Sequence, residues 1–168
     1  IDNSAIHGGG MYNEVSLPTV TNCTFSGNTA NIDGGGMYNY EASSTVTNCT
    51  FSGNTANESG GGMRNSISSP TVTDCTFIDN SATYGGGMSN VDSSPTVRGC
   101  IFENNSASRY GGGMYDENSS PSLNNCVFSS NWTLLDGIGG AIYNNTSSPI
   151  LTNCDFSDNY SGRAGGIY

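Results

Sequence analysis

Hydrophobic residues recur along this chain in very short runs, and within each run they alternate with polar residues. Three such runs, at residues 37–39, 45–47 and 49–51, follow one another with turn-forming Asn and Ser between them. Strict alternation is typical of short β-strands, whose successive side chains point to opposite faces. It predicts three strands in this stretch, with a bend near Asn48 that resets the phase. The inward residues are then Met37, Val46, Cys49 and Phe51, and the outward ones are Tyr38, Thr45, Thr47 and Thr50.

The same pattern returns about every 26 residues. Each Cys lies two residues before a Phe, and each Phe lies three residues before an Asn. A run of Gly precedes a Met or Ile in each unit, which predicts unit boundaries near 11–36, 37–62, 63–87, 88–113, 114–141 and 142–166. The three files of residues are Cys23, Cys49, Cys75, Cys100, Cys126 and Cys154; Phe25, Phe51, Phe77, Phe102, Phe128 and Phe156; and Asn28, Asn54, Asn80, Asn105, Asn131 and Asn159.

A repeat of this length with short strands predicts an all-β fold, a parallel β-helix of roughly six to seven coils. Helical repeats are excluded, because no stretch has a 3.6-residue period and Gly, Asn, Ser and Thr are poor helix formers. The Leu framework of leucine-rich repeats and the regular Asp of calcium-binding nonapeptide repeats are both absent. We expect residues 1–168 to form one β-helix segment of a longer repeat protein, since the chain starts and stops inside repeats.

The files have structural roles in such a fold. Residues one coil apart lie at the parallel inter-strand spacing of roughly 4.8 Å, so the Phe rings are expected to stack inside. Stacked Asn side chains can hydrogen-bond to one another and to the backbone of a turn. For the Cys file, packed free thiols are the favoured interpretation, with pairwise disulfides between neighbouring coils as the alternative. A metal site is not expected, because Cys-x-x-Cys spacing and His partners are missing.

Composition and charge limit the classes of function that are open to this chain. Acidic residues outnumber basic ones by 14 to 4, which gives a net charge of −10 and disfavours binding to nucleic acid or to an anionic membrane surface. No apolar run is long enough to insert into a membrane. The acidic residues are spread over the coils without a catalytic cluster, so no enzyme activity and no cofactor are expected. Asp74 and Arg98 are expected to form at most an exposed ion pair.

Three surface features are candidates for binding. One is an outward series of Tyr side chains, which Arg64 and Ser89 interrupt and Tyr168 ends (Tyr12, Tyr38, Tyr115 and Tyr143). This series is either a binding surface or a consequence of the preference of β-strands for Tyr. Trp132 lies in the only irregular coil, where residues 132–138 form either a binding loop or a bulge whose two Leu cover a gap in the corner. Outward Thr files suggest an ice-binding face as a minor alternative, namely Thr19, Thr45, Thr71 and Thr96 beside Thr21, Thr47 and Thr73.

Two motifs carry a family resemblance. Phe-x-x-Asn occurs six times, from Phe25–Asn28 to Phe156–Asn159, and Gly-Gly-Ala-Ile occurs at 139–142. Together they resemble the repeats of the chlamydial polymorphic outer-membrane proteins, which are adhesive surface domains of autotransporters. The wider pattern is similar to the right-handed, pectate-lyase-like β-helix superfamily. The resemblance implies a right-handed β-helix that is secreted or exposed at the cell surface.

The resulting prediction is a non-catalytic extracellular segment that is adhesive or structural, with a carbohydrate-binding or polysaccharide-active β-helix as the alternative. A host or cell-surface protein, a glycan or the chain itself is the expected partner. Association of the chain with itself would be end to end, since an uncapped β-helix exposes strand edges and apolar residues.

Overall fold

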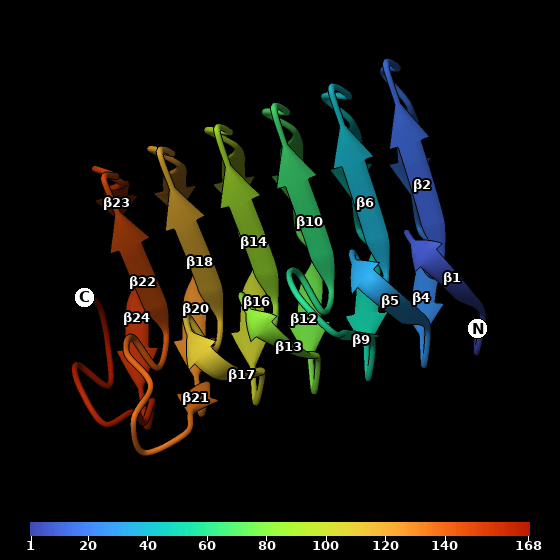
Figure 1. Cartoon of the computed structure of the whole chain (residues 1–168). Helices are drawn as coiled ribbons and strands as arrows, with labels where there is room; N and C mark the ends of the chain where they lie inside the picture. Colours follow the sequence, from blue (N-terminus) through green and yellow to red (C-terminus); the bar gives the residue numbers. More distant parts are fainter.

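Each coil contains four short strands, one more than the alternation pattern predicts. The computed structural model describes residues 1–168 as a stack of coils with the two termini at opposite ends (Figure 1). Strands from successive coils pair in parallel and build four six-stranded sheets, which we call A, B, C and D in the order in which one coil visits them. The parallel β-helix prediction is therefore confirmed.

The strands of sheet A are β1 (Ser4–His7), β5 (Thr29–Asp33), β9 (Thr55–Ala56), β13 (Ser81–Tyr84), β17 (Ser106–Tyr110) and β21 (Trp132–Thr133). Those of sheet B are β2 (Met11–Glu14), β6 (Met37–Tyr40), β10 (Met63–Ser66), β14 (Met88–Val91), β18 (Met114–Glu117) and β22 (Ile142–Asn145). Sheet C contains β3 (Thr19–Thr21), β7 (Thr45–Thr47), β11 (Thr71–Thr73), β15 (Thr96–Arg98), β19 (Ser122–Asn124) and β23 (Ile150–Thr152). Sheet D contains β4 (Thr24–Ser26), β8 (Thr50–Ser52), β12 (Thr76–Ile78), β16 (Ile101–Glu103), β20 (Val127–Ser129) and β24 (Asp155–Ser157).

Sheet A is the one that alternation missed. Its strands begin directly after the Asn file, at polar residues such as Thr29 and Ser81, so their sequence lacks a hydrophobic run. They are strands because each pairs with the strand one coil away, for example Ala30 with Ala56. The strands β5, β9, β13 and β17 each bury one Ala on their inner face, namely Ala30, Ala56, Ala82 and Ala107.

A single residue with positive φ turns the chain at most corners between sheets. Asn48, with a φ of 51°, is the bend predicted between sheets C and D. The corner from sheet A to sheet B is occupied by Gly in the first six coils, because a side chain there has no room. A Cβ on Gly34 would lie 2.6 Å from the Cβ of Tyr38 and 2.7 Å from the carbonyl oxygen of Met37. The first Gly of each run is thus required by the turn.

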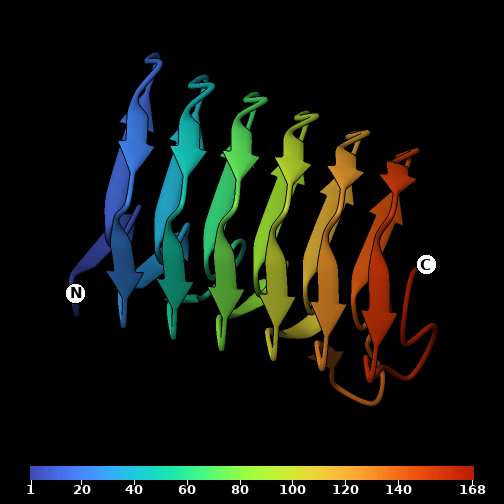
Figure 2. The ribbon, with the colours of Figure 1, turned by 180° about the vertical axis from the view of Figure 1, so that it is seen from behind.

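The core is a column of stacked files. Phe, Met, Val and Cys side chains form one buried cluster, and the rings of Phe51 and Phe77 lie parallel with centroids 4.8 Å apart. The view from behind shows the turns of successive coils lying over one another (Figure 2). The regular outline is broken after β21, where a loop leaves the stack near the C-terminal end (Figures 1 and 2). This loop is the irregular segment singled out in the sequence.

Candidate functional site

The Asn of the Phe-x-x-Asn motif forms hydrogen bonds between successive coils inside the β-helix. The Oδ1 of Asn54 accepts hydrogen bonds from the backbone N–H and from the side-chain amide of Asn28, at 3.0 and 2.8 Å. The amide of Asn54 donates to Asn80 at 2.9 Å and to the carbonyl oxygen of Phe25 at 2.9 Å. The same contacts recur along the whole file, and the internal Asn and Phe side chains are buried. The predicted Asn ladder is confirmed, and its residues are not available for binding.

The Cys file consists of free thiols. The backbone N–H of Cys49 donates to the Sγ of Cys75 at 3.4 Å, and the Cys49 thiol donates to the carbonyl oxygen of Thr47 at 3.2 Å. Burial raises the pKa of the Cys126 thiol to about 11 and also raises that of Cys49. These thiols therefore remain protonated near neutral pH. Packed free thiols, the favoured interpretation, are what the structure contains.

Alkylation of the native protein with iodoacetamide is expected to modify Cys23 and Cys154 first. Cys23 is exposed and Cys154 is partly exposed, whereas Cys49, Cys75, Cys100 and Cys126 are buried. The thiolate is the reactive form, and burial both keeps the reagent away from these four side chains and raises the pKa of Cys49 and Cys126. Peptide mass mapping before and after denaturation measures the difference. Rapid native labelling of Cys75 or Cys100, or disulfide-linked peptides from fresh protein, would contradict the packed-thiol structure.

A second amide ladder runs through sheet B, and the sequence analysis missed it. Asn13 donates to Asn39 at 2.8 Å, Asn39 to Asn65 at 2.9 Å, and Asn65 to Asn90 at 2.8 Å. The sequence contained a signal for this ladder, because an Asn lies two residues after each of the first four Met and shares the inward face of that Met. The ladder continues through the buried carboxyl of Asp116, whose Oδ1 accepts from Asn90 at 2.8 Å.

Asp116 replaces an amide with a group that lacks a donor when it is ionised. It is fully buried and pairs in register with Asn144 on the next coil. Its Oδ2 and the Oδ1 of Asn144 are both buried without a hydrogen-bond partner. Burial raises the pKa of Asp116 to about 7, although the Asn90 amide lowers it. A proton on Oδ2 would supply the donor that the ladder otherwise lacks at this position.

The outward Tyr series is only partly exposed, which corrects the expectation. Tyr38 and Tyr115 keep 8% of their surface exposed, whereas Tyr12 keeps 44%. Side chains at the ends of the sheet A strands cover them, since the ring of Tyr84 lies 5.4 Å from that of Tyr115. Burial and a hydrogen bond to Glu117 raise the pKa of Tyr115. The series is largely a packed seam between sheets A and B.

The seam contains aromatic residues that the sequence analysis did not single out. Tyr110 stacks on Tyr143, with ring centroids 4.6 Å apart, and the ring of Tyr84 lies 5.7 Å from that of Tyr110. Tyr143 in turn lies parallel to Tyr168 at 5.4 Å. Binding through Tyr12 and Tyr143, the less buried members, stays a prediction.

Arg64, the other residue that interrupts the Tyr series, lies near the partly buried carboxylate of Asp33. The Nε of Arg64 is 4.0 Å from the carboxylate of Asp33, and the Nδ1 of His7 is 3.8 Å from it. Burial raises the pKa of Asp33, which both of these partners oppose. These are the ion pairs of the chain, so the pair expected between Asp74 and Arg98 is absent. The Asp74 carboxylate lies over Gly99 instead.

The Thr files on sheet C lie in register over the first four coils. In each file, every Thr but the last pairs in register with the Thr of the next coil. One file contains Thr19, Thr45, Thr71 and Thr96, and the file beside it contains Thr21, Thr47 and Thr73. Arg98 ends one file, and Ser122 and Ile150 continue the other. The regular Thr surface therefore covers only part of the stack.

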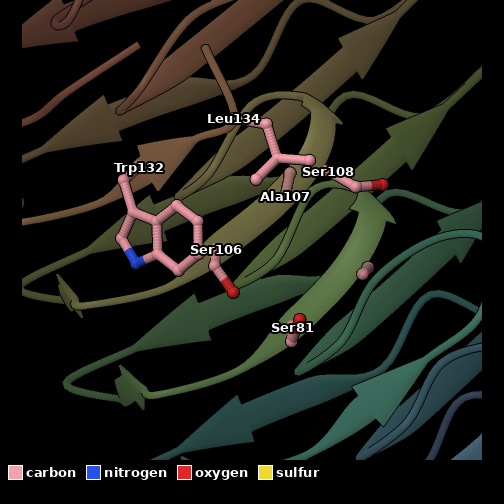
Figure 3. A pocket seen from close by; sticks show the side chains of 7 residues that line it. Ser81, Ser106, Ala107, Ser108, Trp132 and Leu134 are labelled. Carbon is pink, nitrogen blue, oxygen red and sulfur yellow. The ribbon is translucent and has the colours of Figure 1, made fainter. Parts of the chain in front are cut away.

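The outer face of sheet A carries a hollow next to Trp132. Figure 3 shows the indole standing beside Ser106, with Ser81 one coil further along and Leu134 on the opposite side. Ser81, Ser106 and Trp132 occupy the same register position on three successive strands. Ala82, Ala107 and Ser108 complete the lining, and the cavity volume is about 100 Å³. Among the candidate surfaces this is the one with a defined cavity.

The loop that follows Trp132 opens outward. Leu134 keeps 49% and Leu135 keeps 78% of its surface exposed, so the two Leu do not cover a gap in the corner. That alternative for the irregular coil is therefore wrong. The loop turns at Gly137, whose N–H donates to the carbonyl oxygen of Leu134 at 2.8 Å. Trp132, also exposed, continues in register to Tyr160 on the last coil.

Comparison with known families agrees with this architecture. The right-handed β-helix region family matches residues 1–114, which is more than half of the chain. The chain belongs to the right-handed β-helix family. No curated protein and no solved structure matches the chain significantly.

A second match lies over the irregular coil of this β-helix. Residues 125–145 match the repeat of the Chlamydia polymorphic membrane proteins. The segment contains Phe128, Asn131, the Gly-Gly-Ala-Ile motif and Trp132. The resemblance noted in the sequence is thus confirmed at the level of this repeat.

Two further properties of the β-helix bear on its chemistry. Nowhere in the chain do three or more His, Cys, Asp or Glu side chains come together in an arrangement that would hold a metal ion. No helix of the chain is long and apolar enough to span a membrane.

Proposed function

We propose that this β-helix is a non-catalytic segment of a secreted or cell-surface protein and makes adhesive contacts through its outer faces. The match of residues 125–145 to a polymorphic membrane protein repeat supports this proposal most directly. The fold is consistent with an adhesive role, because the residues of the repeat motifs are buried in the core and the outer faces remain for binding. The Phe, Asn and Cys side chains of these motifs hold the coils together, and the outer faces carry the residues that differ between coils.

The dimensions of the stack suit this role. Six coils at the parallel strand spacing extend over roughly 25–30 Å, and each added repeat lengthens the shaft by the same step. Charged residues make up only 11% of the chain, and Ser, Thr and Asn are common among its exposed residues. Such a shaft would carry binding residues away from the surface that anchors it.

Beads coated with the chain test the adhesive role. We expect them to bind cultured epithelial cells more than beads coated with albumin or with the heat-denatured chain. The alternative, a polysaccharide-active β-helix, is tested by incubating the chain with pectin and related polymers and assaying for new reducing ends. Release of such ends would favour the enzyme, and binding no better than albumin would contradict adhesion.

We also propose that the chain associates end to end. Sheets A to D each finish in an edge strand, and apolar residues that are fully buried inside the stack are exposed at its ends. Leu151 keeps 37% of its surface exposed, whereas its register partner Leu123 keeps none. A second copy of the chain would cover these edges.

Light scattering of the isolated chain at increasing concentration is expected to show a rising mass in moderate salt. Screening over roughly 8 Å weakens the repulsion between copies of net charge −10, so association should increase with salt. Replacing Leu151 by Lys places a charge on the exposed edge and is expected to reduce the mass toward that of a monomer. A monomer at high concentration in moderate salt would contradict end-to-end association.

A further inference from the structure

The hollow beside Trp132 exists because one coil differs from the others. On the preceding strands of sheet A the same register position holds Thr29, Thr55, Ser81 and Ser106, which are small. The indole of Trp132 therefore rises beside a low floor, whose outward side chains are those of Ser81 and Ser106. The longer loop then brings Leu134 to the other side of this floor. The result is a cavity with an aromatic wall, an aliphatic wall and a floor of small residues.

The size and charge of the cavity restrict its ligand. A volume of about 100 Å³ is well below the range of roughly 300–1,000 Å³ that encloses a whole drug-sized molecule. The cavity therefore holds one ring or one end group of a larger molecule. None of the lining residues is charged, and the chain carries a net charge of −10, so an anionic group is disfavoured.

The polar groups of the cavity are free. The hydroxyls of Ser81, Ser106 and Ser108 and the indole N–H of Trp132 make no hydrogen bond within the chain. By contrast, the hydroxyls of the buried Ser68 and Ser93 each donate to a backbone carbonyl oxygen, at 2.9 and 2.8 Å. Free hydroxyls around an exposed aromatic face suit a ligand that has an apolar face and a polar rim. A pyranose ring has both, since its C–H groups lie on one face and its hydroxyls project from its edge.

We propose that this cavity binds a single neutral pyranose residue within a longer glycan, with the sugar ring stacked on Trp132 and its hydroxyls bonded to the three Ser. The inference deepens the proposed adhesive function and rests on it, because it names the class of partner for one outer face. Leu134 closes the cavity on the side away from the indole, and Tyr160 extends the exposed surface beyond Trp132 along the same register position.

Intrinsic fluorescence tests the proposal directly, since Trp132 is the only Trp of the chain. The probes are cellohexaose, mannohexaose and a tetrasaccharide of N-acetyllactosamine, with polygalacturonate as the anionic comparison and a Leu- and Pro-rich octapeptide as the peptide comparison. We expect at least one neutral oligosaccharide to change the emission saturably at millimolar concentration or below. No response to any neutral probe, or a response to the octapeptide alone, would overturn the proposal.

Variants locate the binding. For the oligosaccharide that responds, titration calorimetry should show Trp132→Ala weakening the affinity by about tenfold or more, as for the loss of an aromatic anchor. Ser106→Val, which fills the floor and removes a hydroxyl, should weaken it as well. Leu17→Ala removes an exposed apolar residue from the first coil, outside every candidate binding surface, and is the control that should leave the affinity unchanged. Circular dichroism confirms that each variant is folded.

The outcomes separate this inference from the proposed function. If coated beads bind cells and Trp132→Ala beads bind equally well, while no neutral oligosaccharide binds the chain, adhesion stands and the glycan site is wrong. If the oligosaccharide binds in a Trp132-dependent way but the beads do not bind cells, the glycan site stands and adhesion is wrong. Equal affinity of Trp132→Ala and the unaltered chain overturns the glycan site whatever the beads show.

Discussion

Replacing Phe77 by Ala is expected to lower the free energy of unfolding by about 3–5 kcal/mol. Phe77 has no exposed surface, and its ring stacks on Phe51 and on Phe102, with centroids 4.8 Å away in each case. Removing it leaves a cavity in the middle of the stack, which close packing on both sides prevents from collapsing. Urea denaturation followed by circular dichroism measures the loss.

Phe25 provides the matched control, because it stacks on one neighbour only and is partly exposed. Phe25→Ala should therefore cost clearly less than Phe77→Ala. Phe77→Leu keeps most of the volume and serves as a milder variant if the Ala variant does not fold. Equal losses at Phe25 and Phe77 would contradict a core in which stacking on both sides stabilises the interior coils.

The second prediction concerns pH. The pKa of the Asp116 carboxyl is raised to about 7 in the folded chain, mainly by burial, compared with roughly 3.9 in an unfolded one. A raised pKa means that the folded state binds the proton more tightly. The contribution of this proton to stability is therefore fully present below about pH 4 and is lost as the pH rises through about 7. Above that value the ladder contains an unpaired buried charge.

Asp116→Asn is expected to remove this dependence by restoring the amide that the other coils carry. The variant should have nearly the stability of the unaltered chain at pH 4–5 and exceed it by a few kcal/mol at pH 8. Denaturant unfolding at a series of pH values measures the difference between the two curves. Asp92→Asn, at an exposed corner, is the control and should leave the pH dependence unchanged. Parallel curves for Asp116→Asn and the unaltered chain would show that Asp116 keeps its ordinary pKa.

The protonated ladder also bears on the proposed environment of the segment. Because burial of Asp116 favours its uncharged form, the stack is expected to be more stable in mildly acidic surroundings than in alkaline ones.

The sequence by itself determined the axis of the fold and the order of its core. A period of about 26 residues puts each Phe over the next Phe and each Asn over the next Asn, whatever the details of the coil. Local alternation then decides which of these side chains are buried, as at Val46 and Phe51. The same alternation was sufficient to place Asn39 inside, so the second amide ladder was also within reach of the sequence.

The tertiary structure alone decided the features that depend on how one sheet lies against another. Sheet A exists through pairing between coils and not through any hydrophobic run, because Thr29 and Ser81 have no local preference strong enough to define a strand. Tyr38 and Tyr115 are outward by alternation but buried, since the sheet A strands turn over them. The hollow at Trp132 likewise requires the register of three strands and the outward path of Leu134. Alternation and period report the direction of a side chain within its own strand, whereas its exposure depends on neighbours that lie a whole coil away in sequence.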